Sequence, residues 1–112
     1  MAKVIITNAL KEEIFRKFKA LSERILLQIK SLEENPKKGK ALGHVAGIVI
    51  KELKYEKYRF YFITDGFKVK FGTEDEIASL LIKFVRMSEK KDQKKIINEI
   101  KDVLKSFGFD GF

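Results

Sequence analysis

Basic side chains recur beside aromatic residues on the stretches of this chain that are predicted to be strands. Four of them are candidates for chemistry on a phosphate group: Lys51, Lys54, Arg59 and Arg86. Arg59 stands between Tyr58 and Phe60, where its guanidinium can contact a phosphate through two nitrogens or stack on a nucleotide base. An ion pair between Arg59 and Glu52 or Glu56 on the neighbouring strand is an equally good interpretation. The pattern indicates a surface for a polyanion and leaves the role of Arg59 open.

Side-chain alternation bears on how many of these cations can act together. It places Lys51 and Lys54 on opposite faces of their strand, and it separates Lys83 from Arg86 in the same way if that strand is regular. A second set is predicted to bind RNA outside the reacting group: Lys57, Lys83, Lys90, Lys91 and Lys94. Cations in the first turns of a helix are disfavoured by its dipole, and a bound anion would offset that cost. A solvated helix face is the simpler explanation for any one of these lysines.

The charge of the chain favours an anionic partner. Its 112 residues carry 24 Lys and Arg against 16 Asp and Glu, which gives a net charge of +8 and a pI near 9.6. Such an excess raises association with nucleic acid and with other anionic surfaces. A basic protein that is merely soluble has the same composition, so charge alone does not choose a function.

The residue types that are absent exclude several kinds of site. There is no cysteine, which excludes disulfides and thiolate metal sites, and there is no Gly-rich phosphate loop. The single histidine, His44, has no second ligand at metal-binding spacing, and the acidic run at residues 74–76 is typical of a solvated turn. We therefore expect no metal and no cofactor.

The length and hydropathy of the chain limit the number of domains it can form and the cellular location it can have. A chain of 112 residues closes around one core, so residues 1–112 are expected to form a single domain. No apolar run approaches the roughly 20 residues that span a bilayer, and the opening MAKVIITN is too polar for a signal peptide. We expect a soluble cytoplasmic protein without a membrane partner.

The first third of the chain is predicted to be a strand followed by helix. Residues 4–7 are a short apolar run, and Thr7 or Asn8 can cap the helix after it. Apolar residues then recur at steps of three or four from Leu10 to Leu32, which indicates one long helix or an antiparallel pair that turns near residues 20–23. Pro36 ends this helical region, and residues 37–47 are predicted to be a mobile linker.

The middle of the chain is predicted to form an antiparallel sheet. Residues 48–55 and 58–64 have strand composition and are joined by a turn at 56–57. Asp65-Gly66 is a two-residue hairpin signal, so residues 67–71 are expected to return antiparallel to the preceding strand. Residues 73–76 follow as an acidic turn, and residues 77–85 as a largely apolar, central strand. The fold class predicted here is α+β, with an N-terminal strand and helical hairpin packed on an antiparallel sheet of about four to five strands.

A C-terminal helix completes the predicted fold. Ser88 is the expected N-cap, and Gly108 is the expected stop. The buried face of this helix is predicted to consist of Ile96, Ile97, Ile100, Val103, Leu104 and Phe107. Phe109 and Phe112 in the tail either pack on the body or remain exposed for docking.

This order of elements resembles the RelE/ParE superfamily of toxins from toxin–antitoxin modules. The resemblance rests on SLEENPKKGKALGHVAGIVIKELKYEKYRFYF at residues 31–62 and on LLIKFVRMSEKKDQKKI at residues 80–96. The first segment is similar to the progression in that family from Asn-Pro through glycines and a hydrophobic-Lys-Glu-Leu strand to Tyr-Arg. Tyr58-Arg59, followed by alternating aromatic residues, is the most specific match.

The resemblance implies a RelE-like ribonuclease that enters the ribosomal decoding site and cuts messenger RNA without a metal. The ribose 2′-hydroxyl attacks the adjacent phosphate, cations stabilise the charged intermediate and another group moves protons. Arg59 matches the sheet arginine of that family, Arg86 matches the basic residue after the last strand, and Lys51 and Lys54 match the basic positions before them approximately. The implied partners are the ribosome, its messenger RNA and an antitoxin protein, and a homo-oligomer remains open.

The chain departs from the family pattern at the position of proton transfer. RelE-type toxins often carry Tyr or His near the C-terminus, where this chain has Asp92 and Gln93. ParE-like members, which inhibit DNA gyrase, need no such group. The alternative to an endoribonuclease is therefore a non-catalytic binding protein of the same fold, either a gyrase inhibitor or an RNA-binding protein that has lost the nuclease activity.

Overall fold

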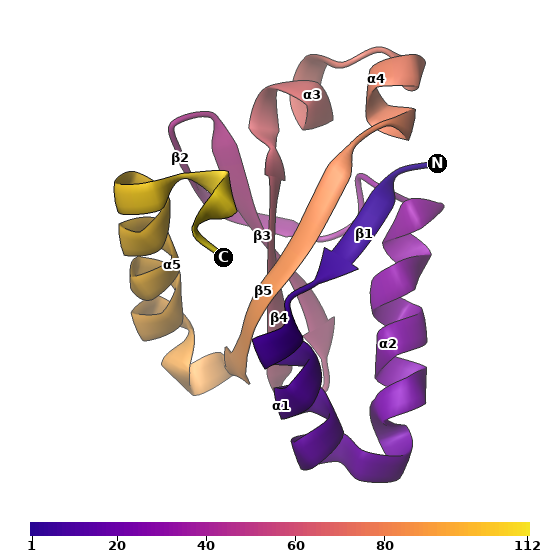
Figure 1. The fold of residues 1–112 in the computed structure, drawn as a ribbon, viewed down its shortest axis with the longest axis vertical. Helices are drawn as coiled ribbons and strands as arrows, with labels where there is room; N and C mark the ends of the chain where they lie inside the picture. Colours follow the sequence, from indigo (N-terminus) through magenta and orange to yellow (C-terminus); the bar gives the residue numbers. More distant parts are fainter.

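A computed structural model describes residues 1–112, and its five strands form one sheet in the order β1-β5-β4-β3-β2 (Figure 1). The strands are β1 (Lys3–Ile6), β2 (Lys40–Val45), β3 (Ile48–Tyr55), β4 (Tyr58–Asp65) and β5 (Leu81–Glu89). The α-helices are α1 (Asn8–Phe18), α2 (Ser22–Lys30), α3 (Gly66–Phe71), α4 (Glu74–Ala78) and α5 (Gln93–Phe107). Short 3-10 helices are η1 (Lys19–Leu21), η2 (Ser31–Glu33), η3 (Lys90–Asp92) and η4 (Phe109–Gly111). The α+β prediction is confirmed, although the sheet is mixed because β1 runs parallel to β5.

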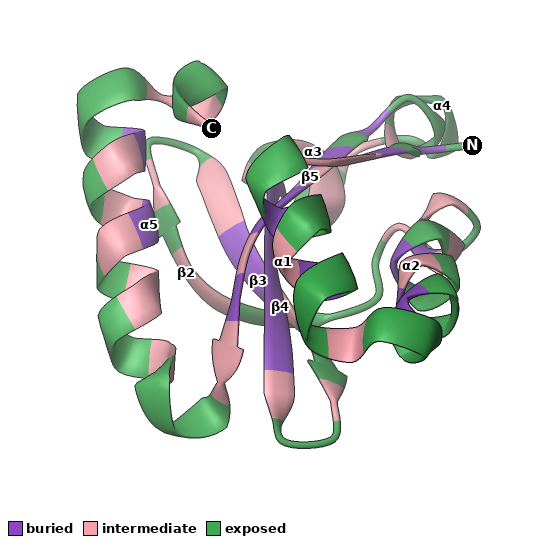
Figure 2. Ribbon diagram, turned by 60° about the horizontal axis from the view of Figure 1, so that its bottom comes forward, coloured by how far each residue is buried: buried purple, intermediate pink, exposed green.

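The sheet separates two layers of helix. Helices α1 and α2 cover one face and α5 covers the other (Figures 1 and 2). Side chains such as Ile14, Ile29 and Phe62 are buried between the sheet and the α1–α2 pair. Ile50, Ile63 and Ile100 are buried between the sheet and α5. Because β3, β4 and β5 are apolar on both faces, the two cores share the same strands.

The N-terminal helices form the predicted antiparallel pair. The Oγ1 of Thr7 accepts a hydrogen bond from the backbone N–H of Leu10 at 3.3 Å, which caps α1 as expected. The chain reverses at η1, which overlaps the range predicted for the turn. Of the two alternatives that periodicity allowed, the structure has the helical hairpin.

The predicted linker at residues 37–47 contains an edge strand, so the expectation of a segment without regular structure is wrong. Strand β2 pairs antiparallel with β3 through a two-residue turn at Ala46 and Gly47, whose φ angles are 50° and 83°. Two successive positive φ angles are the requirement of the turn that best matches the twist of a hairpin. Glycine meets this requirement without strain at Gly47.

The hairpin predicted at Asp65-Gly66 is wrong, because the chain turns there into helix α3. Asp65 is the N-cap, and its Oδ1 accepts a hydrogen bond from the backbone N–H of Lys68 at 3.0 Å. The acidic turn predicted at residues 73–76 is also helical: Thr73 and Glu76 form a reciprocal capping box at the start of α4. Aspartate is favoured both at helix N-caps and in turns, so the sequence Asp65-Gly66 is compatible with either structure.

Strand β5 begins and ends four residues later than the predicted strand at 77–85. Its pairing with β4 shifts between Tyr61 and Phe62: Tyr61 is opposite Arg86 and Phe62 is opposite Phe84. Val85 is therefore an extra residue, which makes a β-bulge in a strand that has neighbours on both sides. The bulge changes which face Arg86 occupies.

The C-terminal helix starts after β5 without the predicted cap. Ser88 lies within β5, and α5 follows the short helix η3. The helix ends at Gly108, whose φ of 69° is the left-handed conformation that favours glycine. Phe109 and Phe112 pack against the core under α5, which decides between the two alternatives for the tail. No helix has both the length and the apolar character that crossing a membrane requires.

Candidate nucleic-acid interface

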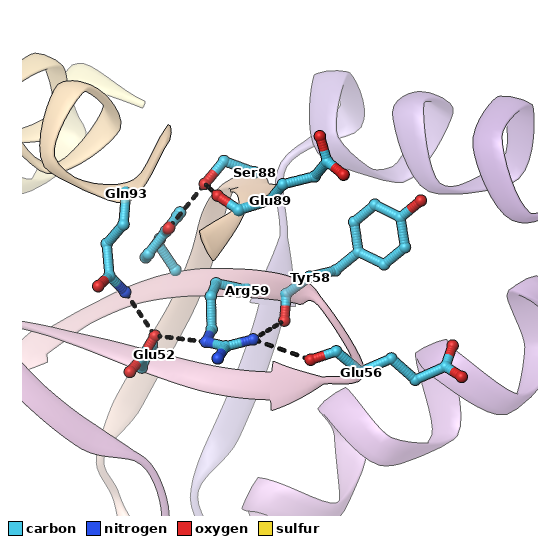
Figure 3. A network of polar contacts seen from close by, with 8 residues as sticks. Glu52, Glu56, Tyr58, Arg59, Ser88, Glu89 and Gln93 are labelled. Atoms are coloured by element: carbon cyan, nitrogen blue, oxygen red, sulfur yellow. Dashed lines mark hydrogen bonds and ion pairs between the residues drawn. The ribbon is translucent and has the colours of Figure 1, made fainter. Parts of the chain in front are cut away.

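Arg59 is held inside the protein by three partners. Its Nε lies 3.2 Å from the Oε2 of Glu52, and its Nη1 donates to the carbonyl oxygens of Glu56 at 3.0 Å and Tyr58 at 2.9 Å (Figure 3). The side chains of Arg59 and Glu52 are only 6% and 11% exposed. The ion-pair interpretation of Arg59 is therefore the one that the structure has, and its guanidinium is not presented to a ligand.

The carboxylate of Glu52 is in turn held by the first residue of α5. The Nε2 of Gln93 donates a hydrogen bond to the Oε2 of Glu52 at 2.6 Å (Figure 3). Register places Glu52 opposite Tyr61 on β4. The Arg59, Glu52 and Gln93 side chains thus connect β4, β3 and α5 on the face that α5 covers.

A pair of hydroxyl groups lies beside this network and was not identified from the sequence. The hydroxyl oxygens of Tyr61 and Ser88 are 2.7 Å apart, and the Ser88 hydroxyl also donates to the carbonyl oxygen of Glu89. Burial raises the pKa of Tyr61 above its ordinary value, so its phenol is held neutral. Aromatic alternation on β4 places Tyr61 on this face, but only the bulge in β5 brings Ser88 to it.

Lys51 lies on the opposite face of the sheet, as alternation predicted, and it is buried. Its Nζ donates to the carbonyl oxygen of Lys37 at 3.0 Å and lies 5.8 Å from the centre of the Phe62 ring. Burial lowers the pKa of its amino group. Lys51 therefore does not join the other three residues of the predicted catalytic set.

Arg86 is the arginine that remains accessible on the face under α5. A regular strand would have put Arg86 and Lys83 on opposite faces, but the strand is not regular, and the bulge at Val85 puts both on this face. The side chain of Arg86 is 36% exposed, and its Nη2 is 3.5 Å from the Oε2 of Glu99. This loose contact leaves most of its five N–H donors free.

Exposed cations gather where the β3–β4 turn, the end of β5 and the start of α5 meet. Backbone pairing fixes this junction, because the N–H of Lys90 donates to the carbonyl oxygen of Lys57 at 2.9 Å. We call this part of the molecule the basic end. Its cations are the partly exposed Arg86 and the exposed Lys17, Lys54, Lys57, Lys90, Lys91, Lys94 and Lys95.

Besides Arg86, two residues of the basic end are partly neutralised. Lys57 Nζ lies 3.0 Å from one carboxylate oxygen of Glu89, and Lys91 Nζ lies 3.5 Å from the other. The hydrogen bond to Lys57 holds the pKa of Glu89 below its ordinary value, and the same bond raises the pKa of Lys57. Lys83 lies outside the basic end, because its Nζ donates to the carbonyl oxygen of Phe112 in the tail.

A polar hollow of about 360 Å³ opens beside the basic end. Strand β1 pairs with β5 only as far as Phe84, so the rest of β5 has no strand on that side and α1 and α5 flank it instead (Figure 1). The hollow is lined by Glu13, Lys17, Tyr58, Arg86, Met87, Ser88, Glu89, Asp92, Lys95 and Ile96. Both cations and carboxylates therefore face one small space.

Of the predicted site residues, the structure brings Lys54, Lys57, Arg86, Lys90, Lys91 and Lys94 to one end. Arg59 lies at the same end, opposite Lys54, but is buried. Lys51 lies on the other face of the sheet and Lys83 beside the C-terminal tail. No group of three or more His, Asp or Glu side chains is arranged to hold a metal ion. Compared with known proteins, the chain matches no protein family, no curated protein and no solved structure.

Proposed function

We propose that this chain is a RelE/ParE-fold protein that binds single-stranded RNA through the basic end and does not cut it. The observation that carries the proposal is that the cations fall into two groups, one exposed at the basic end and one enclosed by the protein. Exposed lysines and Arg86 come from α1, β3, the β3–β4 turn, β5, η3 and α5 and meet at one end, while Arg59 is enclosed by protein partners. Cations grouped on a surface bind a polyanion by charge and counterion release.

The enclosed arginine favours the non-catalytic interpretation. A nuclease of this kind needs cations that face the reacting phosphate and a group that transfers protons. Arg59 directs its donors to Glu52 and to two backbone carbonyls, and Tyr61 is fully buried. Gln93 binds Glu52, and an amide does not transfer protons at ordinary pH.

A RelE/ParE-fold protein of a toxin–antitoxin module is expected to bind an antitoxin protein. An antitoxin that covers the basic end would need an acidic segment, because the surface carries several lysines without a carboxylate partner, such as Lys54, Lys90 and Lys94. A helix or strand laid on this surface would block RNA by occupancy. If the protein were instead a gyrase inhibitor, this surface would be the one to test for gyrase binding.

RNA binding is tested by titrating a fluorescent single-stranded RNA with the protein at several salt concentrations. We expect log affinity to fall with log salt by about 0.7 for each phosphate contact. An oligomer of the same length with an uncharged backbone is the matched control. Affinity that does not change with salt, or equal binding of the uncharged oligomer, contradicts the proposal.

A messenger RNA endonuclease toxin is the second candidate, favoured by the hollow in which carboxylates lie beside Arg86 and Lys95. An ionised carboxylate can accept a proton from a 2′-hydroxyl while the cations stabilise the phosphate. Mapping message ends after incubation with translating ribosomes separates the candidates. Cleavage that is lost in Arg86→Gln supports the endonuclease, and intact message with bound RNA supports the binding protein.

A further inference from the structure

The hollow between α1, β5 and α5 carries two kinds of unpaired charge. Glu13 on α1 and Asp92 before α5 have no cationic nitrogen within 4 Å. Lys17 and Lys95 have no carboxylate within that distance either, although Glu13 and Lys17 are four residues apart on one helix. Such neighbours commonly pair on an exposed helix, so their separation leaves each group free for another partner.

The cations and carboxylates of the hollow come from different elements. Glu13 and Lys17 belong to α1, Arg86 and Ser88 belong to β5, and Lys95 belongs to α5. A ligand that satisfies all of them must carry both an anionic group and hydrogen-bond donors. A nucleotide has this combination in its phosphate and in the edge of its base.

The size and walls of the hollow also suit a nucleotide. Its volume of about 360 Å³ is near the lower end of the range for small-molecule sites, about 300–1,000 Å³. Tyr58 and Ile96 supply flat and apolar surface, and Lys17 Nζ lies 5.4 Å from the centre of the Tyr58 ring. Figure 3 shows the Tyr58 side chain directed away from the Arg59 guanidinium, so these two residues belong to different environments.

We propose that this hollow is a subsite for one unstacked nucleotide of the bound RNA, with its phosphate on Arg86 and Lys95 and a guanine base on Glu13. Guanine presents two adjacent donors, which match the two oxygens of a carboxylate. Uracil presents one donor between two carbonyl oxygens, and a carboxylate repels those oxygens. The inference rests on the proposed RNA binding and adds a base preference and a location to it.

Mononucleotides test the subsite in isolation from the rest of the RNA surface. The probes are 5′-GMP, 5′-UMP and inorganic phosphate, titrated at low salt while backbone amide NMR signals are followed. We expect 5′-GMP to bind about tenfold more tightly than 5′-UMP, the discrimination of one good two-point base contact. The shifted signals should include Glu13, Tyr58 and Arg86.

Two substitutions separate the base contact from the phosphate contact. Glu13→Gln should remove most of the preference for 5′-GMP, by weakening 5′-GMP binding and strengthening 5′-UMP binding, whereas Arg86→Gln should weaken both. Glu12→Gln and Arg24→Gln remove the same charges from exposed positions on α1 and α2 outside the hollow and should change neither. Thermal unfolding of each variant confirms that the fold is intact.

The outcomes distinguish the subsite from the general RNA surface. If 5′-GMP and 5′-UMP bind equally, if neither binds, or if Glu13→Gln keeps the preference, the subsite is wrong. RNA binding that is still salt-sensitive in that case leaves the proposed function standing. If single-stranded RNA does not bind at all, the proposed function fails, whatever the mononucleotides do.

Discussion

The environments of Arg59 and Arg86 differ completely, although both lie on the face of the sheet under α5. Arg59 is opposite Ser88 and Arg86 is opposite Tyr61, so the two positions are close on neighbouring strands. The Arg59 side chain is buried and contacts a carboxylate and two carbonyl oxygens, whereas the Arg86 side chain is about one-third exposed and has one loose contact. A buried arginine whose Nε and Nη1 are held by the protein stabilises the fold, and an accessible arginine with free donors can bind a ligand.

The lysines of β3 show the same division. Lys51 is buried on the α1–α2 side with its Nζ on a backbone carbonyl, and Lys54 is exposed near the β3–β4 turn. Two positions that look alike in the sequence thus have different roles, because one faces the core and the other faces water. Three experiments test this distinction between enclosed and free cations through stability, in order of decreasing effect.

The largest effect is expected from removing Arg59. Arg59→Met leaves the buried carboxylate of Glu52 without its cation, which should lower the free energy of unfolding by about 3–5 kcal/mol. Arg86→Gln should lower it by less than about 1 kcal/mol, because Arg86 is partly exposed. Urea unfolding followed by circular dichroism measures both. Equal losses in the two variants would contradict the distinction.

A double variant tests whether the loss comes from the uncompensated charge. Glu52→Gln together with Arg59→Met removes both charges and keeps an acceptor for Gln93, so it should recover a large part of the stability. If the double variant is as unstable as Arg59→Met alone, the packing of the arginine stem, and not the ion pair, accounts for the effect.

A smaller effect, of opposite sign, is expected at Lys51. Burial lowers the pKa of Lys51 in the folded state below the ordinary 10.5, so the unfolded chain binds more protons between those two values. The stability contributed at this site therefore rises as pH increases through that window. Lys51→Met should be as stable as the wild type or more stable by about 1 kcal/mol at neutral pH, and it should lack the rise. Thermal unfolding from pH 7 to 10 gives the comparison, and a fall in stability of the variant at pH 7 would argue against it.

The smallest effect is expected at Lys57. Its ion pair with Glu89 lies at the surface, with the Lys57 side chain 67% exposed, so Lys57→Gln should leave stability unchanged within the error of thermal unfolding. The same substitution should weaken RNA binding, because it removes a cation from the basic end. A measurable loss of stability would show that the β3–β4 turn depends on this pair.

Much of the fold follows from periodicity in the sequence. The step of three or four from Leu10 to Leu32 and the alternation in β3 and β4 both predict the observed elements, and Thr7 caps α1 as expected. Local signals were ambiguous where one residue type serves two structures. Asp65 before a glycine fits a hairpin turn and an N-cap equally, and in the structure its side chain caps α3.

The candidate site was less predictable, because it depends on one inserted residue. No feature of the sequence marks Val85 as a bulge, yet that residue determines the face on which Arg86 and Ser88 lie. The pairing of Arg59 with Glu52 was one of two interpretations and could be decided only by the register of β3 against β4 and by the position of Gln93. Charge and composition predicted the kind of ligand, and tertiary structure selected the residues that can meet it.

We expect Arg86 to bind RNA, whereas Arg59 stabilises the fold. This difference is tested most directly by the salt dependence of RNA binding in two variants. Arg86→Gln should bind single-stranded RNA about tenfold more weakly than the wild type, with a salt slope smaller by about 0.7. The Glu52→Gln, Arg59→Met double variant should keep the affinity and the slope of the wild type. The reverse result, with RNA binding lost in the double variant and kept in Arg86→Gln, would contradict the account.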